Sequence, residues 1–254
     1  MEMQQVLLMQ SVSGTFYLLT ITIVGIRLLR LAHRNQALPE LMLGLSLLIG
    51  GTFGATLEGG ALAMAATAEP GLIGMLLLIG KICGLIALSC QGIFIWKVFR
   101  PEAIWAPMLV GLCLALSAGA LFGFGQSGTF ATGEIPLRWF WLEMAGRTTG
   151  SLWLIYEAVN YYGLMRKRTR LGLADPVVCN RFLLWAIGGI CGVSMMLTSV
   201  PPVLYPASTH WLLAWDIVLF SVFGIGFSIA YSLVFFPPAF YLRWVSSGAD
   251  VEAA

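Results

Sequence analysis

The sequence predicts an all-α protein, a polytopic bundle of seven transmembrane helices. Of its 254 residues, 59% are hydrophobic and only 10% are charged, and the mean hydropathy is +0.87. Soluble domains carry about 25% charged residues, so the chain falls outside that class. Apolar stretches of membrane length recur along the whole sequence, and cationic residues gather in alternate connections between them. These observations together predict the fold class.

Seven segments are long enough to cross a bilayer core of roughly 30 Å at about 1.5 Å per residue. Their expected ranges are 12–31, 41–58, 72–98, 106–124, 137–164, 182–200 and 212–236. The connections between them leave no room for a soluble domain. The sequence therefore predicts one membrane domain over residues 1–245, followed by a short polar cytoplasmic tail over residues 246–254.

Small residues recur where the predicted helices must approach one another closely. Three spans carry a glycine pair with GxxxG spacing, namely Gly50 and Gly54, Gly119 and Gly123, and Gly188 and Gly192. Such pairs let two helix backbones come close together. We expect these faces to pack within the chain, and a dimer face is the alternative.

The distribution of basic residues predicts the orientation in the membrane. The odd connections and the segment after the last span hold Arg27, Arg30, Arg34, Lys97, Arg100, the cluster at 166–170, Arg181 and Arg243. The even connections hold only Arg138. Since positive residues stay on the cytoplasmic side, the N-terminus is expected outside and the C-terminus in the cytoplasm. The predicted location is the cytoplasmic (inner) membrane.

The fifth span contains charges that hydrocarbon should reject. At about 100° per residue, one helical stripe collects Glu143, Arg147, Gly150, Leu154, Glu157 and Tyr161. A charge at mid-bilayer costs about 2.5 to 3.5 kcal/mol even on lenient insertion scales. This face is therefore expected to look at protein or at a water-filled cavity.

Five charged residues are expected at a similar depth in the outer half of the membrane, and these are Glu58, Lys81, Glu143, Arg147 and Asp216. In one interpretation they form structural ion pairs, with Glu143 and Arg147 bridging at i,i+4 and Lys81 reaching Asp216 or Glu58. In the other they line an externally open cavity that binds a small polar or anionic ligand. Arg147 would then grip the anionic group as a fork and Lys81 would act as a point charge.

A second set of polar residues, Gln91, Glu157 and Asn160, is expected closer to the cytoplasm. Hydrogen bonding between helices is one interpretation of these residues. The other is an inner polar track that moves a solute or protons.

The sequence lacks the residues that several common cofactors and enzymatic reactions require. The last span has no lysine for a retinal Schiff base, and the two histidines fall on opposite sides of the membrane, so no haem, metal or other cofactor is expected. No hydrolase or nucleotide-binding motif is present, and no enzyme is expected. A lipid-modifying reaction at Glu58, Glu143 or Asp216 stays open as the enzymatic alternative. No nucleic-acid partner is expected, because the cationic residues do not cover one face.

The last span ends in the segment Phe235-Phe236-Pro237-Pro238-Ala239-Phe240-Tyr241-Leu242-Arg243-Trp244. It resembles the junction that ends the seven-helix membrane sensor region of some bacterial signalling proteins. In those proteins the junction leads into a kinase or another output domain. Here only residues 246–254 follow, so the resemblance implies that the output belongs to a separate cytoplasmic signalling protein.

These observations favour a receptor or sensor whose charged outer cavity binds an external ligand. The expected partners are the lipid bilayer, that ligand and a cytoplasmic signalling protein. Two alternatives remain, a transporter of small solutes or protons, and an accessory subunit of a larger membrane complex.

Overall fold

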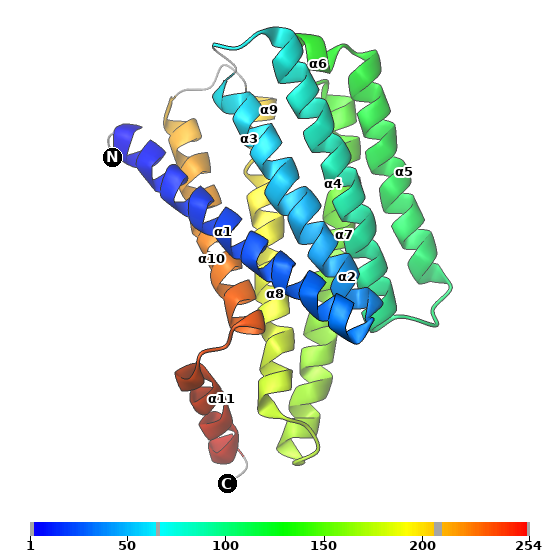
Figure 1. Ribbon diagram of the computed structural model, residues 1–254, viewed down its shortest axis with the longest axis vertical. Helices are drawn as coiled ribbons and strands as arrows, with labels where there is room; N and C mark the ends of the chain where they lie inside the picture. The colour runs from blue at the N-terminus through cyan, green and yellow to red at the C-terminus, as the bar shows by residue number, and fades with distance from the viewer. Residues whose placement is uncertain (1–2, 65–66, 206–209, 253–254) are drawn as a thin grey trace. The chain divides into compact units, whose positions relative to one another are not determined.

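A computed structural model describes residues 3–64, 67–205 and 210–252, and this part of the chain is helical, without a strand (Figure 1). The helices are α1 (Met3–Asn35), α2 (Leu38–Leu45), the π-helix η1 (Ser46–Gly54), α3 (Ala55–Ala63), α4 (Pro70–Phe99), α5 (Trp105–Gln126), α6 (Thr129–Thr132), α7 (Leu137–Arg170), α8 (Pro176–Leu197), α9 (Val200–Leu204), α10 (His210–Phe235) and α11 (Ala239–Glu252). The predicted all-α class is confirmed for these residues.

Six helical stretches in the described part of the chain are long and apolar enough to cross a membrane. They are Leu8–Asn35, Leu38–Ala61, Pro70–Phe99, Trp105–Gln126, Pro176–Leu197 and Trp215–Phe235, and each overlaps one predicted span. They indicate a multi-pass membrane protein. The remaining predicted span, 137–164, lies within the 34-residue helix α7, which is long enough but too polar to join this group.

The chain divides into two compact units. The central unit comprises Ile21–Gly150 and Val200–Ser208, and the terminal unit comprises Met1–Thr20, Ser151–Ser199 and Thr209–Ala254. Helices α1 and α7 each contribute residues to both units. The predicted membrane domain thus comprises two compact units. Helix α11 continues to Glu252 through most of the predicted tail, and residues 253 and 254 lie outside the described part.

In the central unit, α4 packs against α2, η1, α3, α5 and α6. The contact with η1 is close because it runs through glycine: a Cβ added at Gly50 would lie 2.3 Å from the Cβ of Ala87. One added at Gly54 would lie 3.2 Å from the Cβ of Cys83. Gly123 packs in the same way under the Trp139 ring of α7. These glycine faces pack within the chain, as expected.

The π-helix in the second span is a feature that the sequence analysis missed. Helices α2 and α3 continue one another through η1, so residues Leu38–Ala61 still form one membrane-length stretch (Figure 1). The Thr52 hydroxyl of η1 lies 2.9 Å from the Thr22 hydroxyl of α1, within hydrogen-bonding distance. The second span therefore departs from regular α-helical geometry where it packs against α4. π-Helical segments are rare and often mark functional sites.

In the terminal unit, α8 packs against α10 and α11. Gly188 and Gly192 of α8 lie under the rings of Tyr231 and Phe227, and these two rings stack with centroids 4.2 Å apart. The third glycine pair therefore also serves packing within the chain. All three pairs therefore contact neighbouring helices of the same chain.

Helix α11 begins directly after Pro237-Pro238, as expected for a pair that cannot continue α10. The Asn180 side chain of α8 donates a hydrogen bond to the Tyr241 hydroxyl and so ties α11 to α8. Burial raises the pKa of the Tyr241 phenol above its ordinary value. Phe240 and Trp244, one turn apart, are exposed and leave an apolar face on α11.

Candidate functional site

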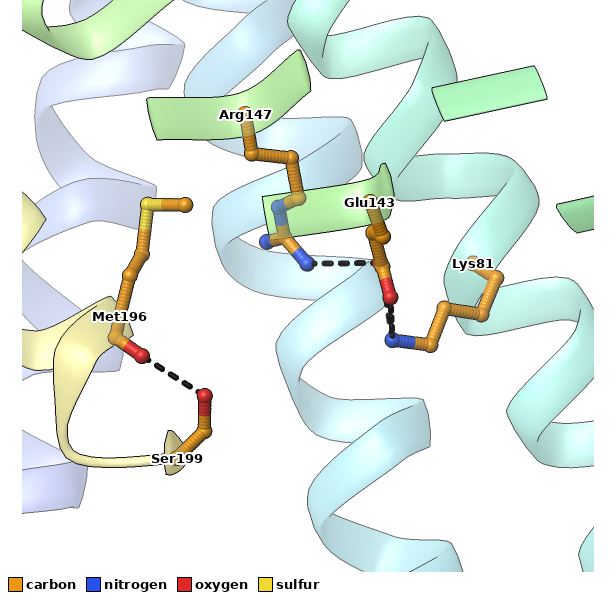
Figure 2. Close-up of polar contacts among 5 residues, drawn as sticks. All are labelled: Lys81, Glu143, Arg147, Met196 and Ser199. Atoms are coloured by element: carbon orange, nitrogen blue, oxygen red, sulfur yellow. Dashed lines mark hydrogen bonds and ion pairs between the residues drawn. The ribbon is translucent and has the colours of Figure 1, made fainter. Parts of the chain in front are cut away.

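The central unit contains an ion-paired cluster of three side chains from two helices (Figure 2). Lys81 Nζ of α4 donates to both carboxylate oxygens of Glu143 on α7, at 2.9 Å to Oε1 and 3.0 Å to Oε2. Arg147 Nη1, one turn further along α7, donates to the same Glu143 Oε1 at 3.2 Å. One carboxylate therefore serves two cations, and the formal charges of the three groups sum to +1.

The Glu143–Arg147 pair at i,i+4 is present as the sequence predicts, but Lys81 has a different partner. It binds Glu143 rather than Glu58 or Asp216. The Glu58 side chain instead packs on α4 at Gly80, where an added Cβ would lie 2.6 Å from Glu58 Cγ. No ion pair joins Glu58 to Lys81 in the described residues. Asp216 lies half-buried on α10, in the terminal unit.

A cavity lies beside the cluster, with about 20 Å³ of room for water molecules. Its wall combines Lys81, Glu143, Arg147 and Ser117 with apolar side chains of α4 and α5, namely Leu85, Leu88, Leu121 and Phe124. Since a single water needs about 10–15 Å³ by this measure, the space admits one or two waters or one ion of similar size. The ring of Phe124 also lies 5.8 Å from Lys81 Nζ, within the range of a weak cation–π contact.

Ser117 of α5 is a residue that the sequence analysis missed. It is only 7% exposed, and its hydroxyl is buried without a hydrogen-bond partner in the described part of the chain. A Cβ added at Gly146 of α7 would lie 2.4 Å from Ser117 Oγ, so α5 and α7 approach closely here. A lone serine in an apolar span carries little signal in sequence, because hydroxyls commonly bond within their own helix.

Helix α7 has the burial pattern of a helix with a polar interior face. Glu157 is fully buried, and its Oε1 accepts a 3.1 Å hydrogen bond from Trp153 Nε1. The apolar side chains of Leu152, Tyr156 and Val159 are half-exposed or more. In a water-soluble helix the polar residues would lie outside. The predicted stripe on α7 therefore faces protein, and its apolar side faces outward.

The predicted inner track is divided between the two units. Gln91 lies half-buried on α4 in the central unit, whereas Glu157 and Asn160 lie on the part of α7 that belongs to the terminal unit. The track therefore stays a prediction.

Among the described residues, no group of three or more His, Cys, Asp or Glu side chains is placed to hold a metal ion. The cysteines are in the thiol form, and three of them, Cys90, Cys113 and Cys179, are buried.

A comparison with protein-family models, curated proteins and solved structures finds no match to this chain. Function is therefore inferred from the residues of the site and their geometry. The cluster offers hydrogen-bond donors and an excess positive charge beside a small, partly open cavity. Such an arrangement suits a small, electron-rich guest.

Proposed function

We propose that this chain is a receptor or sensor of the bacterial cytoplasmic membrane whose charged cavity binds a small polar or anionic ligand from the external side. The observation that carries the proposal is the cavity beside Lys81, Glu143 and Arg147, with the buried Ser117 hydroxyl in its wall. A purely structural ion pair needs neither an adjacent void nor a buried hydroxyl without a partner. This combination favours recognition over a structural role.

The proposal includes a seventh span, α7, with the N-terminus outside and the C-terminus in the cytoplasm. The outward apolar side of α7 and the fully buried Glu157 support a helix surrounded by lipid and protein rather than by water. The basic run at residues 166–170 supports a cytoplasmic end for α7.

Cysteine labelling in intact cells tests this orientation. In a cysteine-free background, Thr132→Cys on α6 should react with a membrane-impermeant maleimide, whereas Leu171→Cys should react only after permeabilisation. Both positions are exposed, so access to the reagent depends on the side of the membrane. The reverse pattern would refute the proposed orientation.

The signal would leave through α7 and α11. Helix α7 runs without interruption from Glu143 to Arg170, so a shift at the cavity can move its last turn. The exposed Phe240 and Trp244 of α11 add an apolar surface for the membrane or a cytoplasmic signalling protein.

Hydrogen exchange on the full chain in lipid nanodiscs tests the receptor proposal. With a panel of inorganic anions and small organic acids, at least one solute should slow exchange around Lys81 and Glu143 and also change exchange at residues 166–175. Arg147→Ala should still fold and lose both effects. Loss of folded protein in this variant would favour a structural ion pair, and protection confined to the cavity would argue against a receptor.

Transport is the second candidate, and the observation that favours it is the fully buried Glu157 on the same helix as the cavity. Buried carboxylates in membrane helices often carry protons. In proteoliposomes, a transporter should accumulate a solute or move protons, and Glu157→Gln should slow this flux. No flux with the panel above would remove this candidate.

A further inference from the structure

We propose that the cavity binds one dehydrated halide ion, chloride under cellular conditions, with Lys81 Nζ and Ser117 Oγ as donors. This inference rests on the proposed function and deepens it, because it names the ligand class. Three observations carry it: the charge of the cluster, the hydroxyl of Ser117 and the size of the cavity.

The charge of the cluster favours an anion. Glu143 contributes one negative charge, and its oxygens accept from Lys81 and Arg147, which contribute two positive charges. An ammonium group has three donors, and two of those on Lys81 are directed at Glu143, which leaves one for a guest. The charged side chains in the cavity wall thus sum to +1, and an anion beside them is stabilised in a surrounding of low dielectric constant. A cation in the cavity would be repelled by Lys81 and Arg147.

The Ser117 hydroxyl supplies a second donor. It is buried in the cavity wall and makes no hydrogen bond in the described part of the chain. Burying a hydroxyl without a partner is unfavourable, because the group loses its hydrogen bonds to water. Gly146, whose missing Cβ leaves room for Ser117 Oγ, allows α7 to approach α5 at this point. An anion in the cavity would accept from Ser117 and so complete its hydrogen bonding.

The size and lining of the cavity select a monatomic guest. About 20 Å³ suffices for one or two waters, and a halide is only somewhat larger than a water molecule. Phosphate, sulfate and carboxylates have several heavy atoms and need donors on more sides. Beyond Lys81, Ser117, Glu143 and Arg147 the wall is apolar, with Leu88, Leu121 and Phe124, so the donors lie on one side of the cavity only. A halide has no directional requirement and tolerates such a wall.

Thermal unfolding of the purified full chain in detergent tests the proposal. Sodium chloride and sodium bromide should raise the unfolding temperature in a saturable way relative to sodium gluconate at equal ionic strength, because a ligand of the folded state stabilises it by mass action. Sodium sulfate should not. The absence of any difference between halide and gluconate would overturn the proposal.

Two variants separate a halide site from a structural cluster. Ser117→Ala should weaken the apparent halide affinity about tenfold, the effect of one lost charge-assisted hydrogen bond. Glu143→Gln should tighten it, because it removes the negative charge in the described cavity wall while keeping an acceptor for Lys81. A structural cluster predicts instead that Glu143→Gln lowers stability equally in chloride and gluconate.

Ser228→Ala is the matched control. Ser228 is buried like Ser117, but its hydroxyl donates to the Gly224 carbonyl of its own helix at 2.8 Å. Its loss should leave the halide dependence unchanged. Equal effects of Ser117→Ala and Ser228→Ala would count against the site.

Chloride-35 line broadening on the wild-type protein gives a readout that needs no variant. Broadening that bromide reverses would support binding, and its absence would refute it. If halides fail to bind while another solute changes exchange at residues 166–175, the receptor proposal stands and this inference falls. If halides bind without that change, the site stands and the receptor proposal falls.

Discussion

Two carboxylates on the same face of α7, Glu143 and Glu157, have different surroundings. Glu143 binds Lys81, which is 62 residues away in the sequence, and lies beside a cavity. Glu157 is fully buried and accepts a hydrogen bond from Trp153, one turn earlier on its own helix. The first contact joins two helices, whereas the second is local to one. A shared inward face on a helix therefore does not imply a shared role.

The free-energy cost of removing a charged group from water explains why the two carboxylates have different partners. Removing charged groups from water is expensive, and the cost is offset only when partners are held in good geometry. At Glu143 those partners are two cations, and one of them comes from α4. At Glu157 the indole N–H supplies a neutral donor. We therefore expect Glu143 to specify how α4 and α7 meet, and Glu157 to fix the Trp153 indole on the inward face of α7.

Glu143→Ala should have the largest effect, a loss of about 3–5 kcal/mol in the free energy of unfolding, because it leaves two cations without their carboxylate. Unfolding by denaturant in detergent measures this loss. The matched control is Glu58→Ala, which removes a carboxylate that has no ion pair with Lys81. Equal losses in the two variants would mean that the cross-helix pair contributes nothing specific.

Gly50→Ala tests whether packing, rather than charge, positions α4 in the central unit. The added methyl group would lie 2.3 Å from the Cβ of Ala87, and such overpacking costs about 1–3 kcal/mol. The control is Gly59→Ala on the neighbouring helix α3, where the added methyl group meets no atom within 4 Å. The higher helix propensity of alanine should leave the free energy of unfolding of this variant unchanged or slightly increased. An unchanged free energy of unfolding in Gly50→Ala would show that η1 shifts easily to accommodate the added methyl group.

Trp153→Phe should cost about 1–2 kcal/mol, because it removes the N–H donor to a buried carboxylate but keeps an aromatic ring. Thermal unfolding measures the loss, with the exposed Trp141→Phe as control. A loss as large as that of Glu143→Ala would break the distinction between the two carboxylates.

Glu157→Gln should have the smallest effect, under about 1 kcal/mol, because the amide oxygen still accepts from Trp153 and no charge needs to be desolvated. The same substitution at Glu143 should cost more, since two cations lose their counter-charge. Paired unfolding measurements of the two variants give this difference directly. A larger loss at position 157 would reverse the assigned roles.

Hydropathy and residue spacing were sufficient for much of this architecture. Membrane-length apolar runs require helices, since every backbone group must be bonded within the segment, and six of the expected spans agree with the structure. The i,i+4 pair of Glu143 and Arg147 follows from helix geometry alone. The close packing at Gly50, Gly123 and Gly188 follows from the small size of glycine. All of these depend on local rules.

The contacts of Lys81 and Ser117 depend on how helices distant in sequence meet. Nothing in the spacing distinguishes Glu143 from Glu58 as the partner of Lys81, because the choice depends on the relative rotation of α4 and α7. Likewise, the close approach of Gly146 on α7 to the Ser117 hydroxyl on α5 joins two helices that are separate in sequence. The π-helix η1 also escapes local rules, since its residues are compatible with an ordinary α-helix. Helix formation is thus encoded residue by residue, whereas the cavity arises from the packing of helices that local sequence does not orient.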